Sequence, residues 1–175
     1  MLRLLCFILV TILGVSAQEA GQGLVMVLIG PPGSGKTTQS ELLAKRYKVP
    51  VVAGDAALTD DGLRTRLKAL DVSRGFILDG YPATHHQADF LGALVKEMKL
   101  PSPIILQLDV PDDVVRQRLA GKEKPAVVAK SLAQYHKEMD LIREYYPQGD
   151  IWTVIGTRPI ADVTRTIVSL IQDRH

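Results

Sequence analysis

The chain is poor in cysteine and carries no large excess of charge of either sign. Its one cysteine, Cys6, lies in the first segment of the chain, so a domain formed by the remainder has no disulfide and no cysteine-ligated metal site. The 21 Lys and Arg residues against 19 Asp and Glu residues leave a net charge of +2. Because the basic residues are also dispersed, charge does not indicate a nucleic-acid-binding protein. With 175 residues, 46% of them hydrophobic, and no internal repeat, the sequence predicts one globular domain.

The start of the chain has the layout of a secretory signal peptide. Arg3 gives it a positive end, residues 4–15 carry no charge, and the small residues 15–17 suit a cleavage site, which are the three expected regions. The uncharged run is shorter than the roughly 20 residues that span a bilayer. We therefore expect a signal peptide at residues 1–17.

This expectation divides the chain into a leader, a spacer at residues 18–23 and a folded domain at residues 24–175. The cleaved domain is then exported, periplasmic or secreted, and has no stable membrane insertion. Two alternatives remain open. The leader stays uncleaved as an anchor, or translation starts at Met26 and the protein is cytoplasmic.

Short apolar runs alternate with amphipathic segments along the domain. Alternation of this kind predicts an α/β fold with a five-stranded, mostly parallel sheet and helices on both faces. The expected strands are residues 24–29, 49–53, 76–78, 103–110 and 151–155. The expected helices are residues 36–47, 59–70, 85–98 and 128–146, one whose first turn contains Pro111, and one opened by Pro159. Thr59 or Asp60 is available to cap the second helix and Asp109 to cap the fourth.

A glycine-rich segment follows the first expected strand. Residues 30–37 read Gly-Pro-Pro-Gly-Ser-Gly-Lys-Thr, which fits the pattern G-x-x-x-x-G-K-[ST] at each required position. Glycines let the backbone turn its amide groups toward one point, and the following helix adds its positive end there. In this pattern Lys36 reaches the β- and γ-phosphates and the Thr37 hydroxyl binds Mg²⁺. A turn that only links strand to helix is the alternative, but the position between a buried strand and a helix favours phosphate binding.

A carboxylate follows a neighbouring strand. Asp79 comes directly after residues 76–78 and is therefore expected at the carboxyl edge of the sheet, where open α/β folds bind ligands. We interpret it as a direct or water-mediated partner of Mg²⁺. A solvated turn aspartate before Gly80 is the alternative.

Several segments together resemble the adenylate kinases, which are nucleoside monophosphate kinases with the P-loop NTPase fold. The resemblance covers most of residues 24–173 in register and implies a three-layer sandwich. It rests on the phosphate loop at residues 30–39, the segment Gly-Phe-Ile-Leu-Asp-Gly-Tyr-Pro-Ala-Thr at 75–84 followed by Gln87-Ala88, and residues 108–111, 118–121, 141–146 and 154–159.

The resemblance also implies roles for individual residues. Lys36 and Arg118 are the expected catalytic residues, and Gly156 is expected to border the adenine of ATP. On the acceptor side, Asp79 is near Mg²⁺ and Gln87 reads the base of an AMP-type acceptor. The remaining expected contacts are Gly33, Ser34, Gly35, Thr37, Thr38, Arg118 and Gly156 for ATP, Asp55, Asp79 and Gln87 for the acceptor, and Thr37 and Asp79 for Mg²⁺. The expected cofactors are ATP and Mg²⁺, the expected partners are nucleotides, and we expect a monomer.

The sequence also departs from the family pattern. Ala83 stands where the family has an arginine that grips the acceptor phosphate, and no helical insert separates Asp55 from Thr59. A short link at residues 122–126 replaces the mobile lid. Residues such as Lys124, Lys130 and Gln134 replace the two arginines that follow the lid, while Arg64, Arg66 and Arg74 lie toward the acceptor side.

These departures predict intact binding of the phosphate donor and weakened transfer. An arginine at such a site can be worth about 10³–10⁵ in rate, because phosphoryl transfer depends mostly on positioning and charge neutralisation. The leading hypothesis is Mg-dependent transfer from ATP to a nucleoside monophosphate, weakened by the missing arginines. A non-catalytic nucleotide-binding module and a small-metabolite kinase on the same scaffold are the alternatives.

Overall fold

The computed structural model describes residues 23–147 and 149–173. The expected signal peptide at residues 1–17 lies outside the described residues, as does the spacer apart from Gly23. Within the described ranges, no helix combines the length and the hydropathy needed to cross a membrane.

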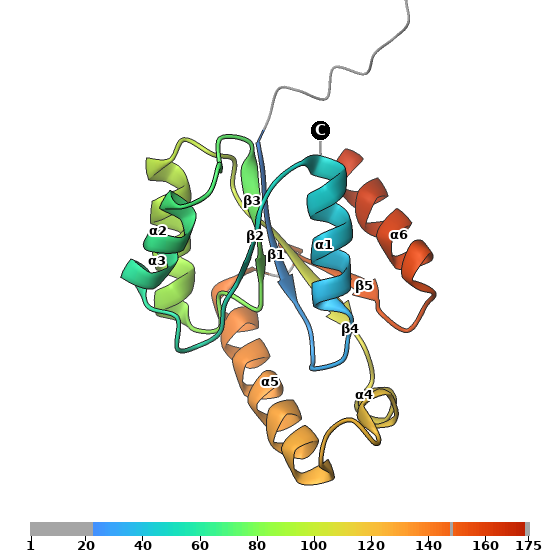
Figure 1. Cartoon of the computed structure of the whole chain (residues 1–175). Helices are drawn as coiled ribbons and strands as arrows, with labels where there is room; N and C mark the ends of the chain where they lie inside the picture. Colours follow the sequence, from blue (N-terminus) through green and yellow to red (C-terminus); the bar gives the residue numbers. More distant parts are fainter. Residues whose placement is uncertain (1–22, 148, 174–175) are drawn as a thin grey trace, which may run out of the picture.

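Five parallel strands form one sheet in the order β2-β3-β1-β4-β5 (Figure 1). All residues of β1 and β3 are buried, because helices cover both faces of the sheet and such strands read as continuous apolar runs. The strands are β1 Leu24–Ile29, β2 Val51–Ala53, β3 Gly75–Asp79, β4 Ile104–Asp109 and β5 Ile151–Ile155.

Helices pack on both faces and complete the expected three-layer sandwich. Helices α1 and α6 cover one face, and α2, α3 and the C-terminal part of α5 cover the other (Figure 1). The helices are α1 Lys36–Tyr47, α2 Asp60–Lys68, α3 His85–Glu97, α4 Asp112–Leu119, α5 Pro125–Tyr145 and α6 Ile160–Gln172.

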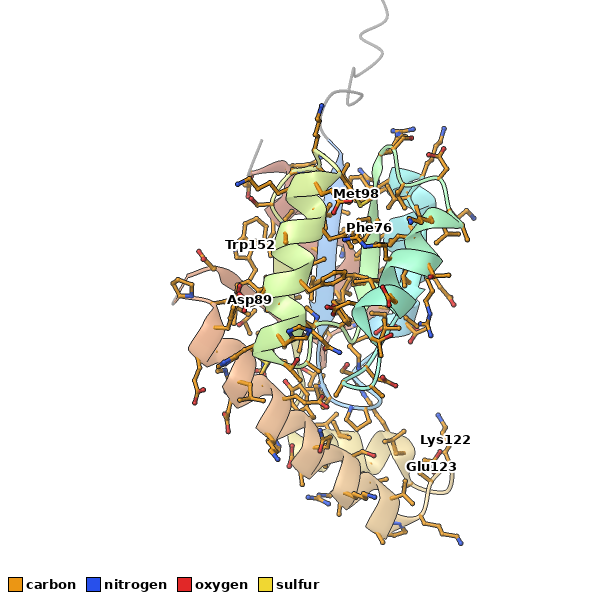
Figure 2. The ribbon with its side chains drawn as sticks, turned by 90° about the vertical axis from the view of Figure 1, so that its left-hand side faces the viewer. Phe76, Asp89, Met98, Lys122, Glu123 and Trp152 are labelled. Atoms are coloured by element: carbon orange, nitrogen blue, oxygen red, sulfur yellow. The ribbon has the colours of Figure 1, made fainter. Side chains whose placement is uncertain are left out.

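Helix α4 and the first half of α5 project beyond the carboxyl edge of the sheet (Figure 1). Figure 2 shows Lys122 and Glu123 at the far end of this projection, away from Phe76 in the sheet. A small apolar cluster that includes Val115 and Leu132 fastens the two helices to each other. Residues of α5, from Val127 to Ile142, form one wall of a cleft at the carboxyl ends of the strands.

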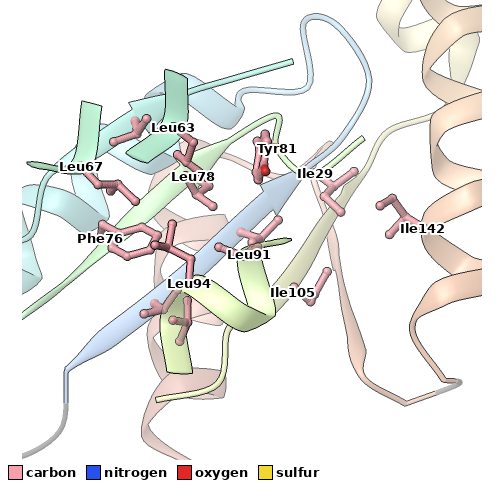
Figure 3. Packing of buried hydrophobic residues seen from close by; sticks show 14 of the residues in the cluster. Ile29, Leu63, Leu67, Phe76, Leu78, Tyr81, Leu91, Leu94, Ile105 and Ile142 are labelled. Atoms are coloured by element: carbon pink, nitrogen blue, oxygen red, sulfur yellow. The ribbon is translucent and has the colours of Figure 1, made fainter. Parts of the chain in front are cut away.

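Leucine-rich faces of α2 and α3 fill the core beside β3. Figure 3 shows Phe76 of β3 with Leu67 of α2 and Leu94 of α3, and all three side chains are buried. Leu63 and Leu91 join the same cluster. The buried residues of each helix recur at spacings of three or four, which is typical of a stripe that faces the core.

Several predicted ends are wrong by a few residues. Pro111 stands just before α4 rather than inside its first turn, whereas Pro159 opens α6 as predicted. Asp109 does not cap α4; it ends β4, and its backbone oxygen accepts a hydrogen bond from the amide of Gly156. Helix α2 ends before Leu70, which is 40% exposed.

Of the two predicted caps for α2, the threonine is the one used. The hydroxyl of Thr59 accepts a hydrogen bond from the amide of Gly62 at 3.1 Å. This bond satisfies one of the free amides in the first turn of the helix. It fixes the point at which the loop from β2 enters α2.

Candidate active site

The phosphate loop turns sharply between β1 and α1. Gly33 and Gly35 have φ angles of +69° and +96°, a left-handed region that side chains other than glycine rarely adopt. Alternation of left-handed and right-handed residues makes a concave nest of amide groups that binds anions. Apart from Gly35 itself and its two chain neighbours, no atom of the described residues lies within 4 Å of where a Cβ on Gly35 would stand. The loop therefore has the left-handed glycines of an anion-binding loop, and the side of Gly35 is open.

Lys36 lies in the mouth of this loop. Its Nζ donates hydrogen bonds to the backbone oxygens of Gly30, at 2.8 Å, and Pro31, at 3.2 Å. Burial lowers the pKa of its ammonium, and the negative charges of Asp79 and Glu138 offset part of that shift. The ammonium is thus held beside the anion-binding loop by two carbonyl groups.

Thr37 and Asp79 meet at the carboxyl edge, as the sequence predicts. The Thr37 hydroxyl donates a hydrogen bond to Oδ2 of Asp79 at 2.8 Å. The β1–β3 register pairs Asp79 with Leu28 at the end of β1, so the carboxylate lies next to the start of the phosphate loop. A hydroxyl and a carboxylate are both oxygen ligands that suit Mg²⁺, so these residues fit a magnesium ion held directly or through water.

Arg118 of α4 connects the phosphate loop to the loop after β5. Its guanidinium donates to the backbone oxygens of Gly33 at 3.2 Å and of Gly156 at 2.9 Å. A Cβ on Gly156 would stand 2.6 Å from a methyl carbon of Val110, so that position requires glycine. Three residues predicted to contact ATP, from three different loops or helices, therefore lie together.

The comparisons with known proteins agree with this geometry. A family model described as adenylate kinase matches residues 51–151. The adenylate kinase of Pseudarthrobacter chlorophenolicus is 30% identical to this chain over 184 residues, covering 84% of the chain and 96% of the relative. The adenylate kinase of Cyanothece sp. strain PCC 7425 is 32% identical, with 83% and 94% covered, and that of Xylella fastidiosa is 32% identical, with 82% and 96% covered. The chain belongs to the adenylate kinase family.

Adenylate kinases are nucleotide-binding phosphotransferases that use ATP and Mg²⁺. The donor half of the site in this chain has the residues that these ligands need, namely the nest of the phosphate loop, Lys36 and the Thr37–Asp79 pair. Ser34 is buried beneath the loop, and its hydroxyl has no hydrogen-bond partner among the described residues. Thr38 is exposed in the first turn of α1.

Gln87 lines a smaller cavity beside the segment 56–61, and its side-chain amide is hydrogen-bonded inside the protein. It is 3% exposed, and its side-chain oxygen accepts from the amide of Ala83 at 2.8 Å. Its side-chain nitrogen donates to the backbone oxygens of Asp55 at 2.9 Å and Leu58 at 3.0 Å. Both hydrogens of the amide nitrogen are therefore used inside the protein, and to read a base Gln87 would have to release the loop at residues 55–58.

Two of the three arginines expected toward the acceptor side are also occupied. The third, Arg74, directly precedes β3 at the amino edge of the sheet, opposite the cleft. Arg64 forms an ion pair with Glu97 at 2.8 Å and packs over the ring of Phe90, while Arg66 donates to the backbone oxygen of Ala53. Both contacts hold α2 against its neighbours. Neither arginine lines the large cleft next to the phosphate loop among the described residues.

That cleft has a volume of about 750 Å³ and lies between the phosphate loop, the β2 and β3 ends and α5. Asp55, expected to contact the acceptor, lines it, and so do Lys130 and Gln134 of α5. The remaining lining residues are Ile29, Gly30, Pro32, Lys36, Gly54, Gly80, Pro82, Ala83, Val127, Ser131, Tyr135, Glu138 and Ile142.

Glu138 is the residue of this cleft that the sequence reasoning missed. It lies on α5, where Gln134 donates a hydrogen bond to its carboxylate at 2.7 Å. A signal for it existed, because Val127, Ser131, Gln134 and Glu138 form a stripe with spacings of four and three beside the core-facing stripe of the same helix. The core stripe was the stronger pattern and concealed its neighbour.

The buried side chain of Gln39 joins two helices. Its side-chain nitrogen donates to the backbone oxygen of Ile160 at 3.1 Å, and its side-chain oxygen accepts from the Thr164 hydroxyl at 2.8 Å. These bonds fasten α1 to α6 on the face away from the acceptor cleft. They explain why a polar residue of α1 is buried.

Proposed function

We propose that this chain binds Mg·ATP and transfers its γ-phosphoryl group, slowly, to a nucleoside monophosphate of the AMP type. The observation that carries the proposal is the meeting of Lys36, Thr37 and Asp79 at the phosphate loop. The first two come from one helix and the third from a neighbouring strand, 42 residues away from Thr37. A glycine-rich turn that only linked a strand to a helix would not require a carboxylate beside its lysine and threonine.

Each donor residue has a role in the proposed reaction. The amide groups around Gly33 and Gly35 bind the phosphates, and Lys36 neutralises negative charge on the transferring group. Thr37 and Asp79 would hold Mg²⁺, which supplies further neutralisation across the phosphates. Arg118, already between Gly33 and Gly156, exchanges one backbone contact for a phosphate oxygen.

Slow transfer follows from the acceptor half. Ala83 is buried and brings no charge, Gln87 is occupied by backbone groups, and no arginine lines the cleft among the described residues. The alignment with the Pseudarthrobacter relative runs over more positions than this chain has residues, although only 84% of the chain takes part. This supports the interpretation that the chain lacks segments that the relative possesses.

A nucleotide panel tests the proposal. Transfer from Mg·ATP to AMP, CMP, UMP and GMP is followed by ³¹P NMR for the wild type, Lys36→Ala and Lys45→Ala. We expect detectable transfer that falls about 10²-fold in Lys36→Ala, because a preorganised charge at the transferring group is lost. Lys45 is exposed in the last turn of α1, so its variant should match the wild type. Wild-type turnover no higher than that of Lys36→Ala, or no Mg·ATP binding at millimolar ligand by calorimetry, would overturn the proposal.

The leader and the environment of the mature protein are also a proposal. We infer that residues 1–17 are removed and that the domain is exported as a monomer without membrane insertion. The position of Met26 in β1 argues against a start at this residue. Met26 is fully buried in the strand, so a charged amino terminus there would be removed from water. Mass spectrometry of the native amino terminus is the test: Gln18 as first residue is expected, and Met26 or Val27 would contradict export.

A further inference from the structure

The charges that line the cleft are balanced rather than basic. Among the described residues, Lys36 and Lys130 bring positive charge, and Asp55 and Glu138 bring negative charge. Lys36 belongs to the ATP phosphates in the proposed reaction. The acceptor part of the cleft then has one lysine against two carboxylates; Lys130 and Asp55 are exposed, whereas Glu138 is partly buried.

This arrangement of charges disfavours the binding of an acceptor that carries a phosphate group. A monophosphate has a second pKa of about 6 and so carries close to two negative charges at neutral pH. Two carboxylates in the same cleft disfavour a second dianion beside the phosphates of ATP. The amides and arginines that would offset this repulsion are used elsewhere: Gln87 holds the Asp55–Leu58 loop, and Arg64 pairs with Glu97.

Glu138 has a chemical use with a different acceptor. A phosphate oxygen that attacks ATP at neutral pH has already lost its proton, so it needs no base. A hydroxyl group does have a proton to lose, and a positioned carboxylate accepts such a proton in general base catalysis. The hydrogen bond from Gln134 orients the Glu138 carboxylate, which lines the same cleft as Lys36 of the phosphate loop.

We propose that the preferred acceptor of this cleft is an uncharged alcohol, of nucleoside size or smaller, and that Glu138 both selects it and accepts its proton. The proposal rests on the Mg·ATP site described under the proposed function, and it gives a reason for slow transfer to monophosphates. The cleft volume of about 750 Å³ is within the range of sites for small organic ligands.

The transfer step balances without a further reactant. The hydroxyl oxygen forms a bond to the γ-phosphorus of ATP while the bond from that phosphorus to the oxygen bridging the β- and γ-phosphates breaks. The electron pair of the broken bond leaves with ADP. The hydroxyl proton moves to the Glu138 carboxylate and then to water.

Nucleosides paired with their own monophosphates give the sharpest test. Adenosine with AMP, and cytidine with CMP, differ only in the phosphate, and ribose and glucose extend the uncharged set. Binding is measured by calorimetry on residues 18–175 in the presence of Mg²⁺ and a non-hydrolysable ATP analogue, and transfer by ³¹P NMR with ATP. We expect at least one uncharged member to bind more tightly, and to accept phosphate faster, than either monophosphate.

A pair of variants assigns the selection to Glu138. Glu138→Gln keeps the shape and removes the charge, so affinity for AMP should rise about five- to tenfold. Transfer to the uncharged acceptor should fall about 10²-fold because its base is lost, while binding of that acceptor should change little. Asp140→Asn removes one charge from an exposed position of the same helix and should alter neither quantity.

The outcomes separate this proposal from the proposed function. If the ATP analogue does not bind, the donor site itself fails. If the analogue binds but monophosphates remain preferred, or if Glu138→Gln leaves the preference unchanged, the acceptor proposal is overturned while the donor site stands. If the analogue binds and no acceptor of either class binds or is phosphorylated, the acceptor proposal is likewise overturned, in favour of a non-catalytic module.

Discussion

Gln87 uses its amide group to fasten the short loop between β2 and α2. Three hydrogen bonds join it to the Ala83 amide and to the carbonyls of Asp55 and Leu58, at distances of 2.8 to 3.0 Å. Buried polar groups of this kind are costly when they lose their partners. At the scale of single residues, the side chain expected to read the acceptor base thus holds the edge of the acceptor cleft.

Replacement of Gln87 by alanine should destabilise the protein by about 2–4 kcal/mol, because three backbone groups lose a partner at a buried position. Urea unfolding of Gln87→Ala measures this change. Gln117→Ala, at an exposed position of α4, is the matched control and should stay within about 0.5 kcal/mol of the wild type. Binding of Mg·ATP should be unchanged in both variants. A loss below 1 kcal/mol for Gln87→Ala would contradict the structural role.

At the scale of elements, the contact between β1 and β3 leaves no space at its first residue pair. Gly75 opens β3 with a φ angle of +102°, and a Cβ there would stand 2.0 Å from the backbone oxygen of Leu24. The same register brings Asp79, the last residue of β3, next to the end of β1 and the phosphate loop. The glycine at one end of the strand pair therefore sets the position of the carboxylate at the other.

Two glycine substitutions should have opposite effects. Gly75→Ala should cost about 3 kcal/mol or more, since it combines a left-handed backbone with a clash against the next strand. Gly92 lies inside α3, and apart from its chain neighbours and the backbone of its own helix, no described atom lies within 4 Å of the position that a Cβ would take. Gly92→Ala should therefore stabilise the protein by up to about 1 kcal/mol. Thermal unfolding of both variants measures the difference. Similar stability of the two would contradict the strand register.

At the scale of the whole molecule, the sheet is built around β1. This strand lies between β3 and β4 and pairs with both, and it leads directly into the phosphate loop. Its first two residues, Leu24 and Val25, are 7% and 1% exposed and pair with Gly75 and Phe76. Loss of these residues removes apolar burial and strand pairing from the centre of the fold.

A chain that starts at Met26 should therefore be less stable than one that starts at Gln18. Burial of a leucine and a valine is worth about 1.5–3 kcal/mol each, so the melting temperature of the shorter chain should fall by about 10 °C or more. Calorimetry of the two purified proteins makes the comparison. Equal melting temperatures would restore the Met26 start as a folded alternative, whereas the expected fall would favour a start upstream of the strand.

Much of the fold and of the donor site could be predicted because the signals are local. The phosphate loop occupies eight consecutive residues with fixed glycines, and its conformation depends on their own φ angles. The strands that flank it are continuous apolar runs, and the strand predicted at residues 151–155 has the same limits in the structure. Asp79 was placed correctly because parallel strands end at a common edge. The cap expected at Asp109 was wrong because β4 continues through this residue and α4 begins only at Asp112.

The acceptor half depended on contacts between residues far apart in the chain. Whether Gln87 faces a ligand or the Asp55–Leu58 loop is decided by which backbone groups come within 3 Å of it, and those groups lie about 30 residues away. Glu138 joins the cleft because α5 crosses the carboxyl edge beside the phosphate loop.

The residues alone define the phosphate loop and its chemistry, since local backbone geometry suffices for an anion nest. The charge and shape of the acceptor cleft arise only when strands, loop and α5 pack together, because electrostatic and hydrogen-bond partners are chosen by distance in space.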